Sequence, residues 1–203
     1  MKGDIGHFEL VEWWISEFSE AEREYIESVY KPMGCESSRP LTETDMTRSS
    51  GTAVAFLTTL SGWFYKKQDR SIPYRILLKA ENLLNEKTEV LDRYFLYAEL
   101  MSLNYKDRSI PENFKKSIEY CRKQIDLSDL AADCFRMQFK NSKLPSHKGY
   151  KQLAIILEKQ KLFREAIELC SKAKSQGWNG DWDRRIEKCE KRLNSILKSG
   201  PTC

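Results

Sequence analysis

Apolar residues recur at intervals of three and four along most of this 203-residue chain. That spacing places apolar side chains on one face of an α-helix, whereas a half-buried strand would need strict alternation. Nine Gly and six Pro are few for this length, which disfavours a fold built from many tight turns. The expected fold class is therefore all-α, with antiparallel helix pairs joined by short turns.

The first 34 residues predict an acidic helical hairpin. Segment 8–18 carries one apolar face, and Ser19 with Glu22 forms the capping-box pattern at the start of a second helix. Residues 1–50 hold 5 basic and 11 acidic side chains, so this part of the chain is strongly negative. We therefore expect an acidic N-terminal element that is distinct from the rest of the chain.

A Ser- and Thr-rich stretch at residues 35–50 predicts a linker. Residues 51–203 are then expected to form one domain of stacked helix pairs. The pairs are expected at about 53–86, 92–126 and 147–176, and a capping helix at 182–198.

The pentapeptide Asp-Arg-Ser-Ile-Pro occurs at 69–73 and again at 107–111. Each copy follows an aromatic helix and precedes an amphipathic one, and this matched position indicates an internal repeat. We expect Ser71 and Ser109 to cap the following helices, with each proline in the first helical turn.

Residues 147–176 place small side chains where two helices must approach closely, and large ones where gaps must be filled. The pattern resembles a tetratricopeptide repeat. The residues that carry it are Tyr150, Leu153, Ala154, Leu157, Phe163, Ala166, Cys170 and Ala173. Cys170 stands where the repeat usually has an aromatic residue, and Trp178 where it often has Pro. The C-terminal half also resembles the C-terminus of a group of uncharacterised bacterial proteins.

The resemblance implies a short α-solenoid whose first helices line a concave face, with a C-terminal capping helix. Such proteins act as interaction or scaffold modules that bind a peptide or a partner protein, without a cofactor. In this chain the groove-lining positions would be Lys148, Lys151, Ile155, Glu158 and Lys159. Family members that clamp a carboxylate have Asn where this chain has Ile155. We therefore expect an apolar groove with a basic edge, suited to an acidic partner.

Three further residues are candidates for partner binding. Arg70 and Arg108 belong to the two pentapeptides and could extend the basic surface, although each could instead pair with the preceding aspartate. Trp14 could form an exposed aromatic patch with its neighbour Trp13, or it could pack in the core.

The basic C-terminal helix is the alternative candidate surface, because residues 140–203 hold 15 basic and 7 acidic side chains. A ridge of cations could bind nucleic-acid phosphates, although acidic residues interrupt it and it could equally be a solvated end face. The ridge consists of Arg184, Arg185, Lys188, Lys191 and Arg192.

No sequence signature of an enzyme is present, and we expect no catalytic residues, no cofactor and no metal. The six cysteines form no CxxC pair and the chain has two histidines, so a zinc site of usual spacing cannot be drawn. We expect the cysteines to be reduced, the protein to be cytoplasmic, and no segment to cross or enter a membrane. The oligomeric state stays open.

Two remaining features have a structural and a functional interpretation. His147 is expected at the surface, since it stands alone at a helix start. Trp178 and Trp182 flank an Asn-Gly turn, and we expect their indoles to close the end of the helix stack, a small-molecule site being the alternative.

Overall fold

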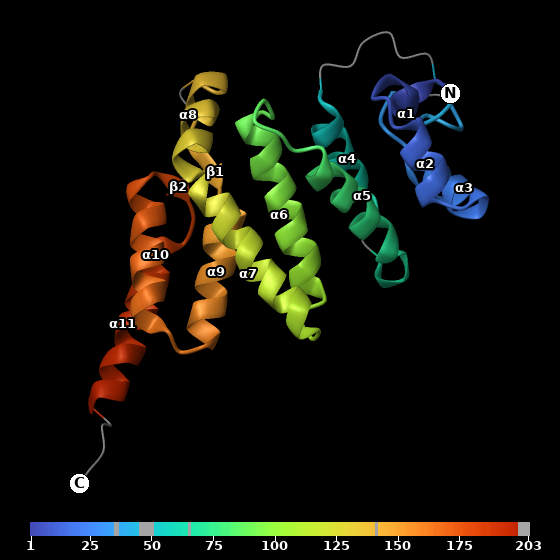
Figure 1. Ribbon diagram of the computed structural model, residues 1–203. Helices are drawn as coiled ribbons and strands as arrows, with labels where there is room; N and C mark the ends of the chain where they lie inside the picture. The colour runs from blue at the N-terminus through green and yellow to red at the C-terminus, as the bar shows by residue number, and fades with distance from the viewer. Residues whose placement is uncertain (35–36, 45–50, 65, 141, 199–203) are drawn as a thin grey trace. The chain divides into compact units, whose positions relative to one another are not determined.

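The computed structural model describes residues 1–34, 37–44, 51–64, 66–140 and 142–198. Within these residues lie eleven α-helices, one short 3-10 turn and one small sheet (Figure 1), which confirms the all-α fold class. The chain divides into two compact units, Met1–Glu99 and Leu100–Cys203. This boundary falls inside a helix. Residues 35–36 and 45–50 of the expected linker lie outside the described residues, so the linker stays a prediction.

The first unit contains the N-terminal helices and the first expected pair. Its elements are α1 (Gly3–His7), α2 (Val11–Glu17), α3 (Glu20–Val29), α4 (Ala53–Ser61), the 3-10 turn η1 (Lys67–Asp69), α5 (Ser71–Asn82) and the first part of α6 (Val90–Lys106). The expected helix 8–18 is broken at Glu9, whose φ is 57°. Because of this break, α2 does not continue the expected helix. Ile15, which the spacing placed on the apolar face of that helix, is 54% exposed.

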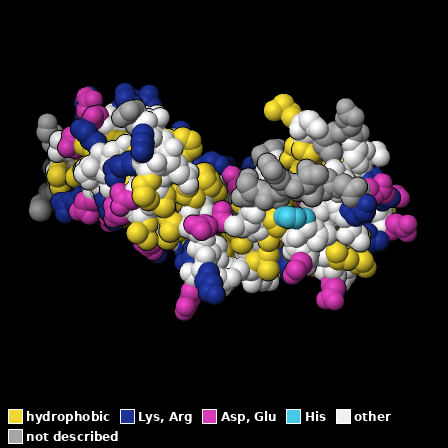
Figure 2. Space-filling model, turned by 90° about the horizontal axis from the view of Figure 1, so that it is seen from above, with side chains coloured by type: hydrophobic (Ala, Val, Ile, Leu, Met, Phe, Trp, Pro, Cys, Tyr) yellow, Lys and Arg dark blue, Asp and Glu magenta, His cyan; other side chains and the backbone are white. Residues whose placement is uncertain are grey.

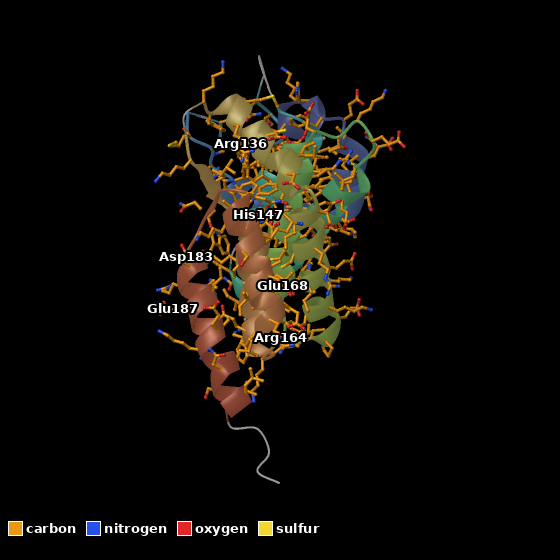
Figure 3. The ribbon with its side chains drawn as sticks, turned by 90° about the vertical axis from the view of Figure 1, so that its left-hand side faces the viewer. Arg136, His147, Arg164, Glu168, Asp183 and Glu187 are labelled. Atoms are coloured by element: carbon orange, nitrogen blue, oxygen red, sulfur yellow. The ribbon has the colours of Figure 1, made fainter. Side chains whose placement is uncertain are left out.

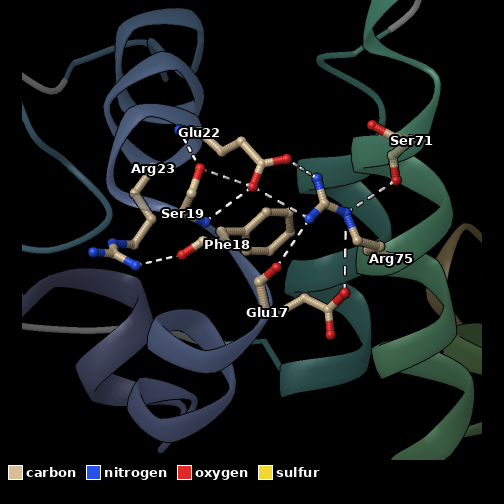
Figure 4. A network of polar contacts seen from close by, with 7 residues as sticks. All are labelled: Glu17, Phe18, Ser19, Glu22, Arg23, Ser71 and Arg75. Carbon is tan, nitrogen blue, oxygen red and sulfur yellow. Dashed lines mark hydrogen bonds and ion pairs between the residues drawn. The ribbon is translucent and has the colours of Figure 1, made fainter.

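The N-terminal helices belong to the same compact unit as α5 and contact it through Arg75. Glu22 accepts hydrogen bonds from the Ser19 backbone, which confirms the capping box, and it also pairs with Arg75 of α5 (Figure 4). The Arg75 guanidinium lies 4.4 Å from the Phe18 ring centroid and donates to the Glu17 carbonyl at 2.9 Å. The hydrogen bond from Arg75 lowers the pKa of Glu22 to about 2, so the carboxylate stays charged.

The two identical pentapeptides adopt different conformations, contrary to the sequence expectation. In the first copy α5 begins at Ser71, whereas in the second copy α7 (Pro111–Asp126) begins only at the proline. Neither Ser71 nor Ser109 caps its helix. The two copies differ because their surroundings differ. Ile72 of the first copy is 5% exposed and packs in the core, whereas the equivalent Ile110 of the second copy is 52% exposed.

The second unit contains the helix pair that was expected at residues 147–176. After α6 and α7 follow α8 (Ser128–Gln138), β1 (Leu144–Ser146), α9 (Lys148–Lys159), α10 (Phe163–Ser175), β2 (Trp178–Asn179) and α11 (Trp182–Lys198). Helix α9 packs on α7 and on α10, and α10 packs on α11. Helices that pack in adjacent pairs are compatible with a solenoid. The small parallel sheet pairs Leu144 with Trp178 and was not expected.

Small residues let the helices of the second unit approach closely. Ala154, Ala166 and Ala173 are all 0% exposed, as the pattern predicted. Ala166 lies in a core cluster with Phe163 and Cys189, and Leu157, Ile167 and Leu193 pack against this cluster. The core therefore has no room for a larger side chain at position 166.

We expect Ala166→Leu to lower the free energy of unfolding by about 1–3 kcal/mol, because the added atoms overpack this cluster. Chemical denaturation of the variant and of the parent chain measures the change. Glu168→Leu is the matched control, since Glu168 is exposed on the same helix (Figure 3). Equal stability of the Ala166 variant and the parent would contradict the close packing of α10.

No helix among the described residues combines the length and the apolar character that a membrane span requires.

Candidate functional site

The exposed face of α9 carries the cations that the sequence analysis singled out. Lys148, Lys151 and Lys159 are exposed, and Ile155 between them is half-buried. These positions follow one another at intervals of three or four residues, so they form one stripe that is about 16 Å long at 1.5 Å per residue. The structure thus presents four of the five predicted α9 residues on one surface, which we call the α9 stripe: Lys148, Lys151, Ile155 and Lys159.

Close packing of α9 on α7 fixes the direction of this stripe. The Gly149 N–H donates to Oε1 of Gln124 at 2.7 Å, in a buried hydrogen bond. A Cβ at position 149 would lie 2.7 Å from the same oxygen and 3.0 Å from the Cys121 carbonyl oxygen. A larger residue would therefore displace the Gln124 side chain and crowd the Cys121 carbonyl, so glycine suits this close approach of α9 to α7.

Tyr105, near the end of α6, joins two of the predicted site residues. Lys159 Nζ lies 3.3 Å from the Tyr105 hydroxyl, and the Arg108 guanidinium lies 4.7 Å from the Tyr105 ring centroid. Arg108 also donates to the Tyr105 carbonyl at 3.0 Å. Tyr105 was not predicted as a site residue, although its position one turn before Arg108 was a usable signal.

Three cations at this surface lack an acidic partner. Within the described part of the chain, Lys151, Lys159 and Arg108 form no ion pair with a carboxylate. Lys159 and Arg108 instead contact the neutral Tyr105. Their positive charge is therefore not cancelled locally, and the surface can attract a carboxylate.

Glu158, which was predicted to line the groove, instead forms ion pairs with residues of α11. Its side chain is 8% exposed and accepts from Arg185 Nη1 at 2.6 Å and from Lys188 Nζ at 2.7 Å. Burial by itself raises the pKa of Glu158, but the hydrogen bonds from Lys188 and Arg185 outweigh this effect and lower the pKa overall. The carboxylate is therefore a structural link between α9 and α11.

Most cations of the basic C-terminal ridge are paired within the protein. Arg185 and Lys188 hold Glu158, Arg184 pairs with Asp181, Lys191 pairs with Glu187, and the Arg192 guanidinium lies 5.9 Å from the Phe163 ring centroid. Paired cations attract phosphates less strongly, because the nearby carboxylates cancel much of their field.

Two of the predicted partner-binding residues do not join the α9 stripe. Trp14 is 1% exposed and its ring centroid lies 5.3 Å from that of Phe18, so it is a core residue and the expectation of an exposed patch at Trp14 was wrong. Arg70 is half-buried and belongs to the first unit, where it precedes α5.

His147 is 0% exposed, so the expectation of a surface histidine was wrong. Its Nδ1 caps α9 by accepting from the Tyr150 N–H at 3.2 Å. The imidazole centroid lies 4.6 Å from the Tyr150 ring and 4.7 Å from the Trp178 ring. Burial lowers the pKa of His147 to about 3, so the ring is neutral at physiological pH.

The indoles of the Trp178–Trp182 segment are buried, as expected for residues that close the helix stack. Trp178 and Trp182 are 2% and 4% exposed. Trp182 Nε1 donates to the Trp178 carbonyl at 2.7 Å, and Trp178 Nε1 donates to Gln176 Oε1 at 3.2 Å. Both indole N–H groups thus donate to acceptors of the protein itself, and the buried rings present no aromatic surface to a ligand.

Cysteines in the described residues act as apolar groups. Cys121, Cys170 and Cys189 are buried free thiols, and burial raises the pKa of Cys121 to about 12 and that of Cys170 to about 11. Such thiols stay protonated and react slowly. Cys35 and Cys203 lie outside the described residues. The described chain contains no group of His, Cys, Asp and Glu residues arranged to hold a metal ion.

Comparison of the chain with protein-family models, with curated proteins and with solved structures finds no match. The function must therefore be inferred from the surfaces themselves.

Proposed function

We propose that this protein is an interaction module and that the α9 stripe, together with Tyr105 and Arg108, binds an acidic segment of a partner protein. The observation that carries the proposal is the row of cations without carboxylate partners in the described chain, namely Lys151, Lys159 and Arg108. Because a half-buried Ile155 lies between the two lysines, the bound segment combines acidic and apolar side chains.

The dimensions of the stripe favour a short extended peptide. A length of about 16 Å accommodates roughly five residues at about 3.3 Å per residue. Alternate side chains of such a segment point to the same side, so acidic groups can contact the lysines while an apolar group contacts Ile155. Exposed ion pairs contribute about 0–1 kcal/mol each, so we expect dissociation constants in the micromolar range or weaker.

A tetratricopeptide-like solenoid is part of the same proposal. The small residues Ala154, Ala166 and Ala173, all buried between helices, support it, as does the packing of α9 with α10 and of α10 with α11. In such an arrangement α9 is the first helix of its pair, and first helices line the binding face.

Nucleic-acid binding through α11 is the weaker candidate. The α11 cations Arg185 and Lys188 are held by Glu158, so a phosphate would have to displace a buried carboxylate. Lys151 and Lys159 hold no carboxylate in the described chain, so a ligand can reach them without such a rearrangement.

Reversing the charge of the stripe is expected to weaken peptide binding about tenfold or more, because two favourable ion pairs become repulsive. The variant is Lys151→Glu with Lys159→Glu, and the probe is a fluorescent seven-residue peptide of alternating Glu and Leu. Fluorescence anisotropy measures the dissociation constant.

Arg164→Glu with Lys172→Glu is the matched control, since both residues are exposed on α10 and the net charge changes equally. We expect this control to bind nearly as well as the parent. Equal weakening of both double variants would show that binding depends on net charge alone and would refute the site. A preference for single-stranded DNA over the peptide would favour the nucleic-acid alternative.

A further inference from the structure

Helix α8 has apolar residues on two opposite faces. One face is buried in the second unit through Ser128, Ala131, Ala132 and Phe135. The other carries Leu130 and Met137, which are 56% and 69% exposed, with Cys134 partly buried between them. We call the residues Leu130, Cys134 and Met137 the α8 seam.

The α8 seam has the spacing of a helix-packing surface. Its residues stand at i, i+4 and i+7, which places them in one line along the helix. Figure 2 looks onto the end of the molecule at which α8 lies, and hydrophobic side chains gather on the surface of the second unit in this view. A line of exposed apolar residues on a helix that is already packed on its other side indicates a partner.

The charged residues beside the seam are separated by sign along α8, with the acidic ones first and the basic ones last. Asp129 and Asp133 lie in its first half, whereas Arg136 lies in its last turn and Lys140 follows its end. The helical angle places all four on the same side of the seam. Within the chain Arg136 pairs with Asp133 at 3.0 Å and donates to the Gln176 carbonyl, so its charge is held in position.

We propose that α8 pairs in antiparallel orientation with α8 of a second copy of this chain. In an antiparallel helix pair the same flank of each helix faces its counterpart, with the directions reversed. The acidic first half then lies beside the basic last half of the other copy. A parallel two-fold pair would instead place this charged flank beside the opposite flank of the other copy, so the acidic and basic halves would no longer face each other.

Cys134 lies at the centre of the seam, so the two-fold axis of such a pair passes close to it. Leu130 of each copy then faces the region of Gln138 in the other copy. The same patch of both copies forms the contact, as closed two-fold symmetry requires. The seam occupies one side of an 11-residue helix that is about 16 Å long. The surface area that it can bury is therefore much smaller than the roughly 800 Å² per partner of a stable dimer. The dimer is therefore weak and forms at high micromolar concentration.

Sedimentation equilibrium of the full chain between 10 µM and 1 mM tests the proposal. A monomer–dimer equilibrium is expected for the parent chain, and Leu130→Glu with Met137→Glu raises its dissociation constant at least about tenfold. Leu78→Glu is the matched control, since Leu78 has the same 56% exposure as Leu130 but lies on α5. Thermal unfolding shows whether each variant remains folded.

A monomer at every concentration overturns the proposal and leaves the seam to another partner. A dimer that survives the double substitution, or that Leu78→Glu weakens equally, also overturns it.

Cross-linking between two chains, each with one accessible introduced cysteine beside the buried Cys121, Cys170 and Cys189, tests the orientation. Cys35, Cys134 and Cys203 are replaced by Ser, and either Leu130→Cys or Gln138→Cys is added. With a short bismaleimide we expect the mixture of the two variants to cross-link faster than either variant alone. Faster cross-linking within each separate variant would indicate a parallel pair and would refute the antiparallel proposal.

This inference is independent of the proposed peptide site. The α8 seam shares no residue with the α9 stripe, so Leu130→Glu with Met137→Glu is expected to leave peptide anisotropy unchanged while it weakens self-association.

Discussion

Lowering the pH from 7.5 to 5.0 is expected to remove about 2 kcal/mol from the free energy of unfolding through His147 alone. Burial lowers the pKa of His147 to about 3 in the folded chain, against 6.5 for an unperturbed histidine. Between these two values the unfolded chain binds a proton that the folded chain does not. Stability is therefore complete above about pH 6.5 and falls as the pH is lowered toward 3.

The loss arises because an imidazolium cannot be accommodated where the ring lies. His147 is 0% exposed, and its Nδ1 must remain an acceptor for the Tyr150 N–H. Protonation would turn this acceptor into a donor and would place a charge between the rings of Tyr150 and Trp178. The helix cap and the aromatic contacts are lost together.

Urea denaturation at pH 7.5 and at pH 5.0 measures this effect. His147→Asn keeps a side chain that can cap a helix but does not titrate, so its stability is expected to change less between the two pH values. His7→Asn, at an exposed position in the first unit, should retain the pH dependence of the parent chain. The same slope in the parent and in His147→Asn would contradict the buried neutral imidazole.

Glu158→Gln is expected to lower the free energy of unfolding by about 2–4 kcal/mol. The substitution keeps the shape of the side chain but removes the charge that Arg185 and Lys188 share. Arg185, whose side chain is 13% exposed, then keeps only Asp181 as an anionic partner in the described chain. The link between α9 and α11 weakens as a result.

Glu187→Gln is the matched control for this substitution. Glu187 also forms an ion pair, with Lys191, but its side chain is 64% exposed and water replaces the lost contact. We expect no measurable change in the unfolding midpoint of this variant. Equal midpoints of the Glu158 and Glu187 variants would contradict the structural role of the buried pair.

Sequence patterns predicted the helices well because their signals are local. The expected capping helix at 182–198 matches α11 (Trp182–Lys198), and the expected pair at 147–176 matches α9 and α10. The capping box of Ser19 and Glu22 was also predicted correctly, since both partners lie within one helical turn. The identical pentapeptides show the limit of this reasoning, because their different surroundings gave them different conformations.

The candidate site was predicted only in part. The interval between Lys151 and Lys159 on one helix shows that they share a face, and the structure agrees. That Tyr105 lies between Lys159 and Arg108 depends on the approach of distant segments. Helical periodicity contains no information about such an approach.

The sequence by itself determined the fold class, most helix boundaries and the small residues at helix contacts, because each depends on neighbours within a few positions. Only the tertiary structure decided which polar side chains are buried and what they contact. His147 and Glu158 have polar side chains that sequence reasoning assigned to the surface, yet both are buried. The physical reason is that a polar group can be buried wherever distant segments supply its hydrogen bonds, and those partners are fixed by packing.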